Sequence, residues 1–193
     1  LPEVNHPVRV ASSAAYLDQI SDGRLEFGTG RQSTWVEMGG FGVQPDQTKE
    51  QWDEIVRVIP KMWTQDDFSW DGKYFKMPER PIYPKPYQDP HPPMWVAVQS
   101  PETAVQAAER GLGFLGVSSG DPRRYEPLVR DYRRIIQSCD PVGSFVNEQV
   151  NAFTWMFCAP TQEEADRGRD SSRAFYAAAG HIVGVGSIYP GPG

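Results

Sequence analysis

The chain has 193 residues, of which 39% are hydrophobic and 23% are charged, and its formal net charge is -6. This composition is typical of a globular protein with one core. Because the balance is acidic and the Lys and Arg residues are scattered, it argues against nucleic acid as a partner. No apolar run approaches the roughly 20 residues that a membrane helix needs, so no membrane partner is expected.

The cysteines and the chain ends give two further expectations. Cys139 and Cys158 lack the spacing of a metal site, so we expect reduced thiols in a cytoplasmic protein without a bound metal. The chain opens at Leu1 rather than at a methionine and closes on a glycine-rich stretch over 180–193. A fragment of a longer protein is therefore expected.

The first predicted elements are a helix and a short strand. Apolar residues at helical spacing predict a helix over 8–20, which Asp22 and Gly23 end. A strand is predicted over 24–28, and it opens into a loop expected over 29–47.

The second predicted helix begins at Thr48. Thr48 and Gln51 match a capping box, in which the threonine accepts from a backbone N–H and the glutamine reaches back. Apolar residues from Trp52 to Ile59 then line one face. Pro60 is expected to kink or end this helix, because it removes a hydrogen bond and clashes with the preceding turn.

Residues 64–93 are predicted to form an insertion that differs in composition from the rest of the chain. Asp71 and Gly72 lie between aromatic strand formers over 68–75, which is a strong hairpin signal. Prolines crowd 78–93, and such a stretch cannot form a helix or a central strand. We expect an excursion from the core that packs on its surface.

The remaining chain alternates strands with helices. Alternation predicts an α/β fold with parallel strands and crossover helices, in either a doubly wound open sheet or a (β/α)8 barrel. A whole barrel takes about 250 residues, so this chain would be part of one, as a single domain over 1–193. The predicted strands are 94–98, 112–117 and 150–158, and the predicted helices are 101–111, 122–138 and 161–179.

A glycine motif over 27–31 lies at the end of the first predicted strand, where parallel α/β folds bind ligands. Gly28 and Gly30 let the backbone approach a ligand closely, and Arg31 can fork onto a phosphate. The alternative is a tight turn with a solvated arginine.

A second motif, Ser100 to Thr103, starts the helix after the next strand. Its hydroxyls and the backbone N–H groups of the helix start can hold an anion. The alternative is a plain N-cap, since serine before proline is typical of one. The two interpretations are compatible, because a capped helix start still points N–H groups outward.

The other polar candidates give no catalytic assignment by themselves. Glu37 lies in the loop after Arg31, where a carboxylate is usually just solvated. The three histidines show no metal-ligand spacing. No metal site is predicted.

Short strings from His6 onward match one family pattern in order and spacing. They are His6-Pro-Val-Arg-Val-Ala, Leu17-Asp-Gln-Ile-Ser-Asp-Gly-Arg24, Phe27-Gly-Thr-Gly-Arg31, Glu37 to Gly42, Pro90-His-Pro-Pro-Met-Trp95, Ser100-Pro-Glu-Thr103 and Ala107-Ala-Glu-Arg-Gly111. With these strings the chain resembles the luciferase-like monooxygenase superfamily. The resemblance covers 6–115 well and 150–165 more loosely.

The resemblance implies a fold and a set of site residues. The fold is a (β/α)8 barrel of which this chain carries about strands four to seven, with flavin at the carboxyl ends of the strands. Arg31 looks like the arginine that pairs with the flavin phosphate, beside Gly30. Ser100 and Thr103 look like hydroxyl residues that hold the same phosphate, and Glu37 matches an acidic position near the flavin.

The activity that the resemblance implies is that of a monooxygenase. Reduced FMN from a separate flavin reductase would react with oxygen and oxidise a small organic substrate, in a protein whose relatives are often homodimers. The fragment alone is expected to be inactive, because strands one, two and eight are missing. Gln32 departs from the glycine that is common in the family, and a side chain there would shift the loop or narrow the approach to the phosphate.

Three alternatives remain at this point. Some members of the superfamily use a deazaflavin coenzyme for hydride transfer, and others could be non-catalytic flavin-binding relatives. A doubly wound nucleotide-binding domain is the third, but Gly28-Thr-Gly-Arg-Gln-Ser33 lacks the third glycine of its motif.

Overall fold

The computed structural model describes residues 1–31, 35–118, 122–154 and 157–183. The chain divides into two compact units, one made of Leu1–Arg31 with Thr48–Thr154 and the other of Gln32–Gln47 with Trp155–Gly193. The single domain expected over 1–193 stays a prediction.

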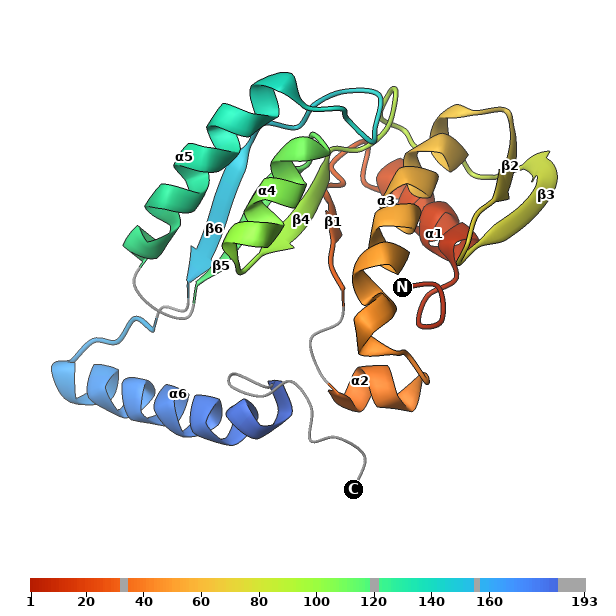
Figure 1. Ribbon diagram of the computed structural model, residues 1–193. Coiled ribbons are helices and arrows are strands. Elements are labelled where there is room, and N and C mark those ends of the chain that lie inside the picture. Colours follow the sequence, from red (N-terminus) through yellow and green to blue (C-terminus); the bar gives the residue numbers. More distant parts are fainter. Residues whose placement is uncertain (32–34, 119–121, 155–156, 184–193) are drawn as a thin grey trace. The chain divides into compact units, whose positions relative to one another are not determined.

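A four-stranded parallel sheet forms the centre of the first unit (Figure 1). Its strands are β1 (Phe27–Thr29), β4 (Met94–Val98), β5 (Gly113–Ser118) and β6 (Val150–Thr154), in the order β1-β4-β5-β6. All three pairings are parallel, which confirms the prediction from the alternation. β1 starts three residues later than predicted and β6 is shorter than predicted.

Helices connect these strands and bury their apolar faces. They are α1 (Pro7–Ile20), α3 (Thr48–Thr64), α4 (Pro101–Glu109) and α5 (Glu126–Ile135), the last between the short 3-10 turns Pro122–Tyr125 and Ile136–Ser138. The core joins apolar residues of α3, β4, α4 and β5, among them Val56, Met62, Val96, Ala107 and Phe114. Burial of this kind stabilises by about 25 cal/mol per Å² of apolar surface.

Helix α3 differs from its prediction at two positions. It continues past Pro60 to Thr64, whose hydroxyl donates to the Pro60 carbonyl at 2.9 Å. Burial of Ile59 and Met62 on both sides of the proline compensates for the single lost backbone bond. The Gln51 half of the predicted capping box is also wrong, because Gln51 Nε2 donates to Glu3 Oε1 at 2.7 Å and Gln51 Oε1 has no partner among the described residues.

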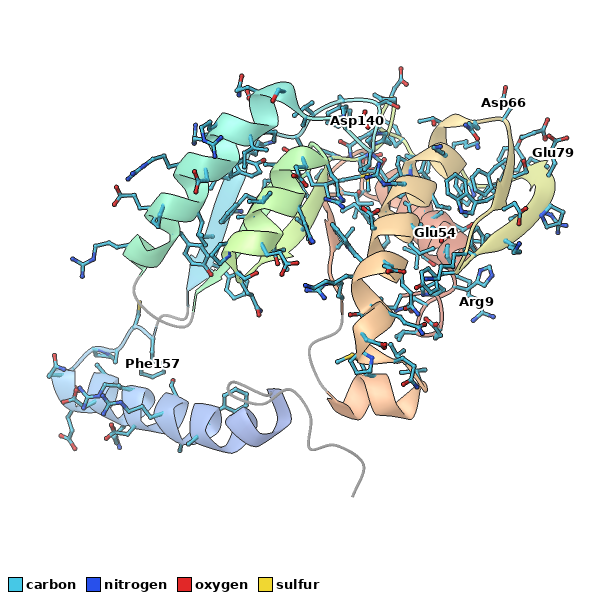
Figure 2. All side chains as sticks on the ribbon, viewed as in Figure 1. Arg9, Glu54, Asp66, Glu79, Asp140 and Phe157 are labelled. Carbon is cyan, nitrogen blue, oxygen red and sulfur yellow. The ribbon has the colours of Figure 1, made fainter. Side chains whose placement is uncertain are left out.

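The predicted hairpin is confirmed. β2 (Asp67–Asp71) and β3 (Lys76–Pro81) pair antiparallel in a separate two-stranded sheet, with Asp71 opposite Lys76. Gly72 N donates to the Phe75 carbonyl at 3.0 Å and closes the turn. Glu54 of α3 projects toward the hairpin (Figure 2) and ties the turn to the helix.

The second unit contains a helix that the sequence prediction missed. The expected loop over 29–47 includes α2 (Trp35–Gly40) and the 3-10 turn Pro45–Gln47. Its glycines end the helix in a Schellman motif: Val43 N donates to the Met38 carbonyl at 2.8 Å, Gly42 N donates to the Gly39 carbonyl at 3.2 Å, and Gly42 has φ +67°.

The other helix of this unit is α6 (Gln162–Val183), and its predicted start is confirmed. Thr161 Oγ1 accepts from the Glu164 backbone N–H at 3.3 Å, as an N-cap residue does. Among the helices of the described residues, none combines the length and the apolar character needed to cross a bilayer.

Candidate cofactor-binding site

The two predicted ligand motifs follow neighbouring strand ends. β1 and β4 are parallel, with Thr29 opposite Val96, so the residues after them reach the same edge of the sheet. Thr29 Oγ1 donates to the Trp95 carbonyl at 2.8 Å and accepts from Trp52 Nε1 at 3.3 Å. These bonds hold the end of β1 between β4 and α3, and Arg31 follows two residues later.

The second motif forms the start of α4. Ser100 is extended, with φ -139° and ψ 159°, and its Oγ accepts from Thr103 N at 3.3 Å. The Ser100 and Thr103 hydroxyl oxygens lie 3.0 Å apart. Pro101 occupies the first helical position. The N-cap prediction is therefore confirmed, and the same hydroxyls lie where the helix dipole favours an anion.

Two cations lie beside this helix start. Arg31 Nη1 donates to Thr48 Oγ1 at 3.4 Å, at the beginning of α3. Lys49, which follows Thr48, pairs with Glu102 in the first turn of α4, and its Nζ lies 2.7 Å from Glu102 Oε1. The Lys49 hydrogen bond and charge hold the pKa of the Glu102 carboxyl below its usual range, and the Arg31 charge lowers it further. The structure thus brings Arg31 close to the helix that carries Ser100 and Thr103.

Lys49 was missed by the sequence reasoning. It follows Thr48 in a string that indicates a helix start, and no residue pattern shows that the starts of α3 and α4 are neighbours. That proximity comes from β1 and β4 being adjacent strands. Among the described residues, the site therefore brings together two cations, two hydroxyls, one helix N-terminus and the Glu102 carboxylate.

The strand end beside the cations has room for a ligand. A Cβ added at Gly28 or Gly30 would meet no described heavy atom within 4 Å. Gly28 pairs with Trp95, whose Nε1 donates to Glu26 Oε2 at 2.5 Å. A close approach of a ligand to the backbone therefore meets no obstacle at these two Cβ positions, and ligand binding there stays a prediction.

Two predicted features fall outside what the structure describes. Gln32 lies outside the described residues. Glu37 belongs to α2 in the second unit, and its side chain is also outside the described part. Its role near a flavin stays a prediction.

His91 has a structural environment. It is 2% exposed, and its Nε2 accepts from Ser144 N at 2.9 Å, so its Nδ1 carries the proton and donates to the Pro92 carbonyl at 2.8 Å. Its ring stacks on Phe145 at 4.9 Å between centroids. Burial lowers the pKa of the His91 imidazole. Among the described residues, no group of three His, Cys, Asp or Glu side chains could hold a metal ion.

Curated relatives of this chain include flavin-dependent enzymes. The chain is 25% identical over 175 residues to the flavin-dependent trigonelline monooxygenase, oxygenase component, of Acinetobacter baylyi, covering 89% of this chain and 47% of that protein. It is 27% identical over 170 residues to the FMNH(2)-dependent dimethylsulfone monooxygenase of Pseudomonas putida, covering 86% and 45%. The chain thus spans a little under half the length of these relatives.

Solved structures share the fold. The monooxygenase RslO1 of Streptomyces bottropensis matches with a TM-score of 0.78 at 30% identity, over 95% of this chain and 56% of that chain. An F420-dependent secondary alcohol dehydrogenase matches with a TM-score of 0.70 at 22% identity, over 90% and 52%, which shows the fold alone. The predicted α/β fold, part of a luciferase-like (β/α)8 barrel, is confirmed.

The sequence profile of the family described as luciferase-like monooxygenase matches residues 1–189. This match covers nearly the whole chain, and it agrees with the parallel sheet. The chain belongs to the luciferase-like monooxygenase family.

Proposed function

We propose that this chain carries the phosphate-binding part of a flavin-dependent monooxygenase that uses reduced FMN. The observation that carries the proposal is the meeting of Arg31, Lys49 and the Ser100–Thr103 helix start at one sheet edge. Two cations beside a helix N-terminus match a phosphate monoester, which bears about two negative charges and three acceptor oxygens.

Each residue of the site would make a different contact with the phosphate. Arg31 would donate two parallel hydrogen bonds, which fix the direction of the phosphate as well as its place. Ser100 and Thr103 would donate their hydroxyl protons, and the positive end of the α4 dipole would attract the same charge. A phosphate held by these residues would place the rest of the cofactor near the carboxyl end of β1. The bound reduced flavin supplies the electrons for oxygen chemistry on a small organic substrate.

FMN is favoured over a deazaflavin by the names of the relatives. The relatives named above at 25% identity or more are a flavin-dependent, an FMNH(2)-dependent and an unspecified monooxygenase, whereas the F420-dependent neighbour is 22% identical. A separate flavin reductase as partner is supported by the relative that is an oxygenase component. A deazaflavin-dependent hydride transfer is the second candidate, because both cofactors contain a phosphate.

The test is flavin binding by the full-length protein. We expect Arg31→Ala to weaken FMN binding by about 1.5–3 kcal/mol, which is roughly 10- to 150-fold in Kd. Arg9→Ala, at an exposed position of α1, is the matched control and should bind FMN like the wild type. A Ser100→Ala/Thr103→Val double variant should also bind FMN more weakly. Unchanged FMN affinity in Arg31→Ala by fluorescence titration would remove the phosphate assignment.

The two cofactor candidates are separated by their reactions. Oxygen consumption with reduced FMN and an organic substrate would support the monooxygenase. Oxidation of a reduced deazaflavin under nitrogen, without oxygen consumption, would support the hydride-transfer enzyme instead.

A further inference from the structure

One carboxylate lies among the groups that would hold the phosphate. Glu102 is in the first turn of α4, next to Thr103, and its Oε1 accepts from Lys49 Nζ at 2.7 Å. Both side chains are half-exposed, at 59% for Glu102 and 51% for Lys49. The Glu102 carboxylate is attracted by the Lys49 ammonium and by the positive end of α4. A bound phosphate would be attracted by the same two groups.

We propose that Glu102 is a built-in competitor for the cofactor phosphate, and that it sets how tightly and how long the phosphate is held. The inference rests on the phosphate site proposed above. When the phosphate binds, Lys49 exchanges its bond to Glu102 for a bond to a phosphate oxygen. The Glu102 carboxylate then remains close to the phosphate as a like charge.

The exchange is favourable because the existing pair is weak and the incoming anion is strong. A solvent-exposed ion pair adds little to stability, since water screens it and two long side chains must be ordered. A phosphate monoester brings about two charges and three acceptors to the same ammonium. Lys49 therefore moves at little cost.

The charges also show why Glu102 limits affinity. Arg31 and Lys49 supply two positive charges and Glu102 removes one. A doubly charged phosphate together with Arg31, Lys49 and Glu102 carries one excess negative charge when Glu102 is ionised and none when it is neutral. A protein that receives reduced flavin from a partner and later releases it needs such a limit, because an affinity that is too high means slow release.

The experiment measures flavin binding and release with four variants of the full-length protein. FMN and riboflavin, which lacks the phosphate, are titrated by fluorescence, and FMN dissociation is followed by stopped flow. Glu102→Gln should bind FMN about three- to tenfold more tightly, with a matching decrease in the dissociation rate and no change for riboflavin. Raising the salt concentration to about 0.5 M should reduce the difference in FMN affinity between Glu102→Gln and the wild type, because salt screens the repulsion between Glu102 and the phosphate.

Two variants test whether Glu102 acts through Lys49, and a third variant is the control. Lys49→Gln should weaken FMN binding several-fold, and in a Lys49→Gln/Glu102→Gln variant the gain from removing Glu102 should shrink. Glu109→Gln removes a carboxylate from the far end of α4 and should leave FMN affinity unchanged. Glu102→Gln should also melt slightly lower, because it loses an acidic residue in the first turn of a helix. A merely structural Glu102 would give that lower melting temperature without tighter FMN binding.

The outcomes separate this inference from the function on which it rests. If the wild type prefers FMN to riboflavin but Glu102→Gln does not bind FMN more tightly, only the competitor role is wrong. If Glu102→Gln tightens riboflavin equally, the effect does not act on the phosphate and the inference is again overturned. If the wild type does not prefer FMN to riboflavin, the phosphate site and the competitor role both fail.

Discussion

Glu54 is expected to be the residue that docks the hairpin on the barrel helix α3. Its two carboxylate oxygens accept four hydrogen bonds: Trp70 Nε1 at 3.0 Å and Phe75 N at 3.1 Å on Oε1, and Lys73 N and Tyr74 N at 3.1 Å each on Oε2. Three consecutive backbone N–H groups thus point at one carboxylate. Figure 2 shows Glu54 between α3 and the hairpin.

Replacing Glu54 by Gln changes one oxygen into an N–H donor without changing the size of the side chain. At least two donors of the turn then face a donor instead of an acceptor. Two hydrogen bonds to a charged group contribute about 1.5–3 kcal/mol each, and partial hydration of the exposed turn offsets about half, so we expect a loss of about 1.5–3 kcal/mol in the free energy of unfolding. That is a large fraction of the 5–15 kcal/mol typical of a domain.

The assay is urea unfolding together with hydrogen exchange of the backbone N–H groups of 73–75. Glu54→Gln should lower the unfolding free energy and speed exchange at these three positions. Glu79→Gln, on the exposed β3 strand of the same hairpin, is the control and should do neither. Gly72→Ala should resemble Glu54→Gln, because a Cβ at Gly72 would lie 2.0 Å from Glu54 Oε1. Equal stability and equal exchange in Glu54→Gln and Glu79→Gln would refute the reasoning.

Two further predictions concern buried polar groups. Burial lowers the pKa of His91 below its unfolded value near 6.5, so the unfolded state binds the extra proton first. The His91 contribution to stability should be constant above about pH 7 and should fall as the pH drops through 6.5, by up to about 1.4 kcal/mol per pH unit for one proton. Urea unfolding at pH 7.5 and 5.5 checks this, and an equal pH dependence in His91→Gln would contradict it. Tyr132→Phe should cost about 1–3 kcal/mol, because the fully buried hydroxyl donates toward the carbonyls of Leu112 at 2.9 Å and Asn147 at 3.0 Å. Thermal unfolding measures it, with wild-type stability as the contradicting result.

Local signals in the sequence predicted the elements whose structure depends on residues that are close to one another along the chain. Met94–Val98 is an apolar run and forms β4 with the predicted bounds. Ser100 caps α4 as its place before Pro101 predicts. Of the two effects expected at Pro60, the end of the helix is wrong, because burial of the helix outweighs one lost hydrogen bond, and the kink stays a prediction. The same local reasoning failed at α2, because the glycines that indicate a loop in fact end a short helix.

The site shows the same division between local and tertiary information. Arg31 and Ser100 were predicted because each follows a strand, and parallel strands place their carboxyl ends at one edge of a sheet. The sequence gives no comparable rule for Lys49 and Glu102, which are 53 residues apart along the chain and start two different helices. Their pairing depends on how α3 and α4 flank β1 and β4.

Glu102 illustrates why such a residue needs the structure to be interpreted. From the sequence it is a favourable acidic residue in the first turn of a helix, and that interpretation is correct for the stability of α4. Its bond to Lys49 adds a second consequence, since the attraction that stabilises the helix is the one that a phosphate would use. A substitution at Glu102 should therefore move helix stability and phosphate affinity in opposite directions. A residue that only stabilised the fold would change helix stability and leave phosphate affinity unchanged. Measuring both quantities therefore tells more than measuring either one.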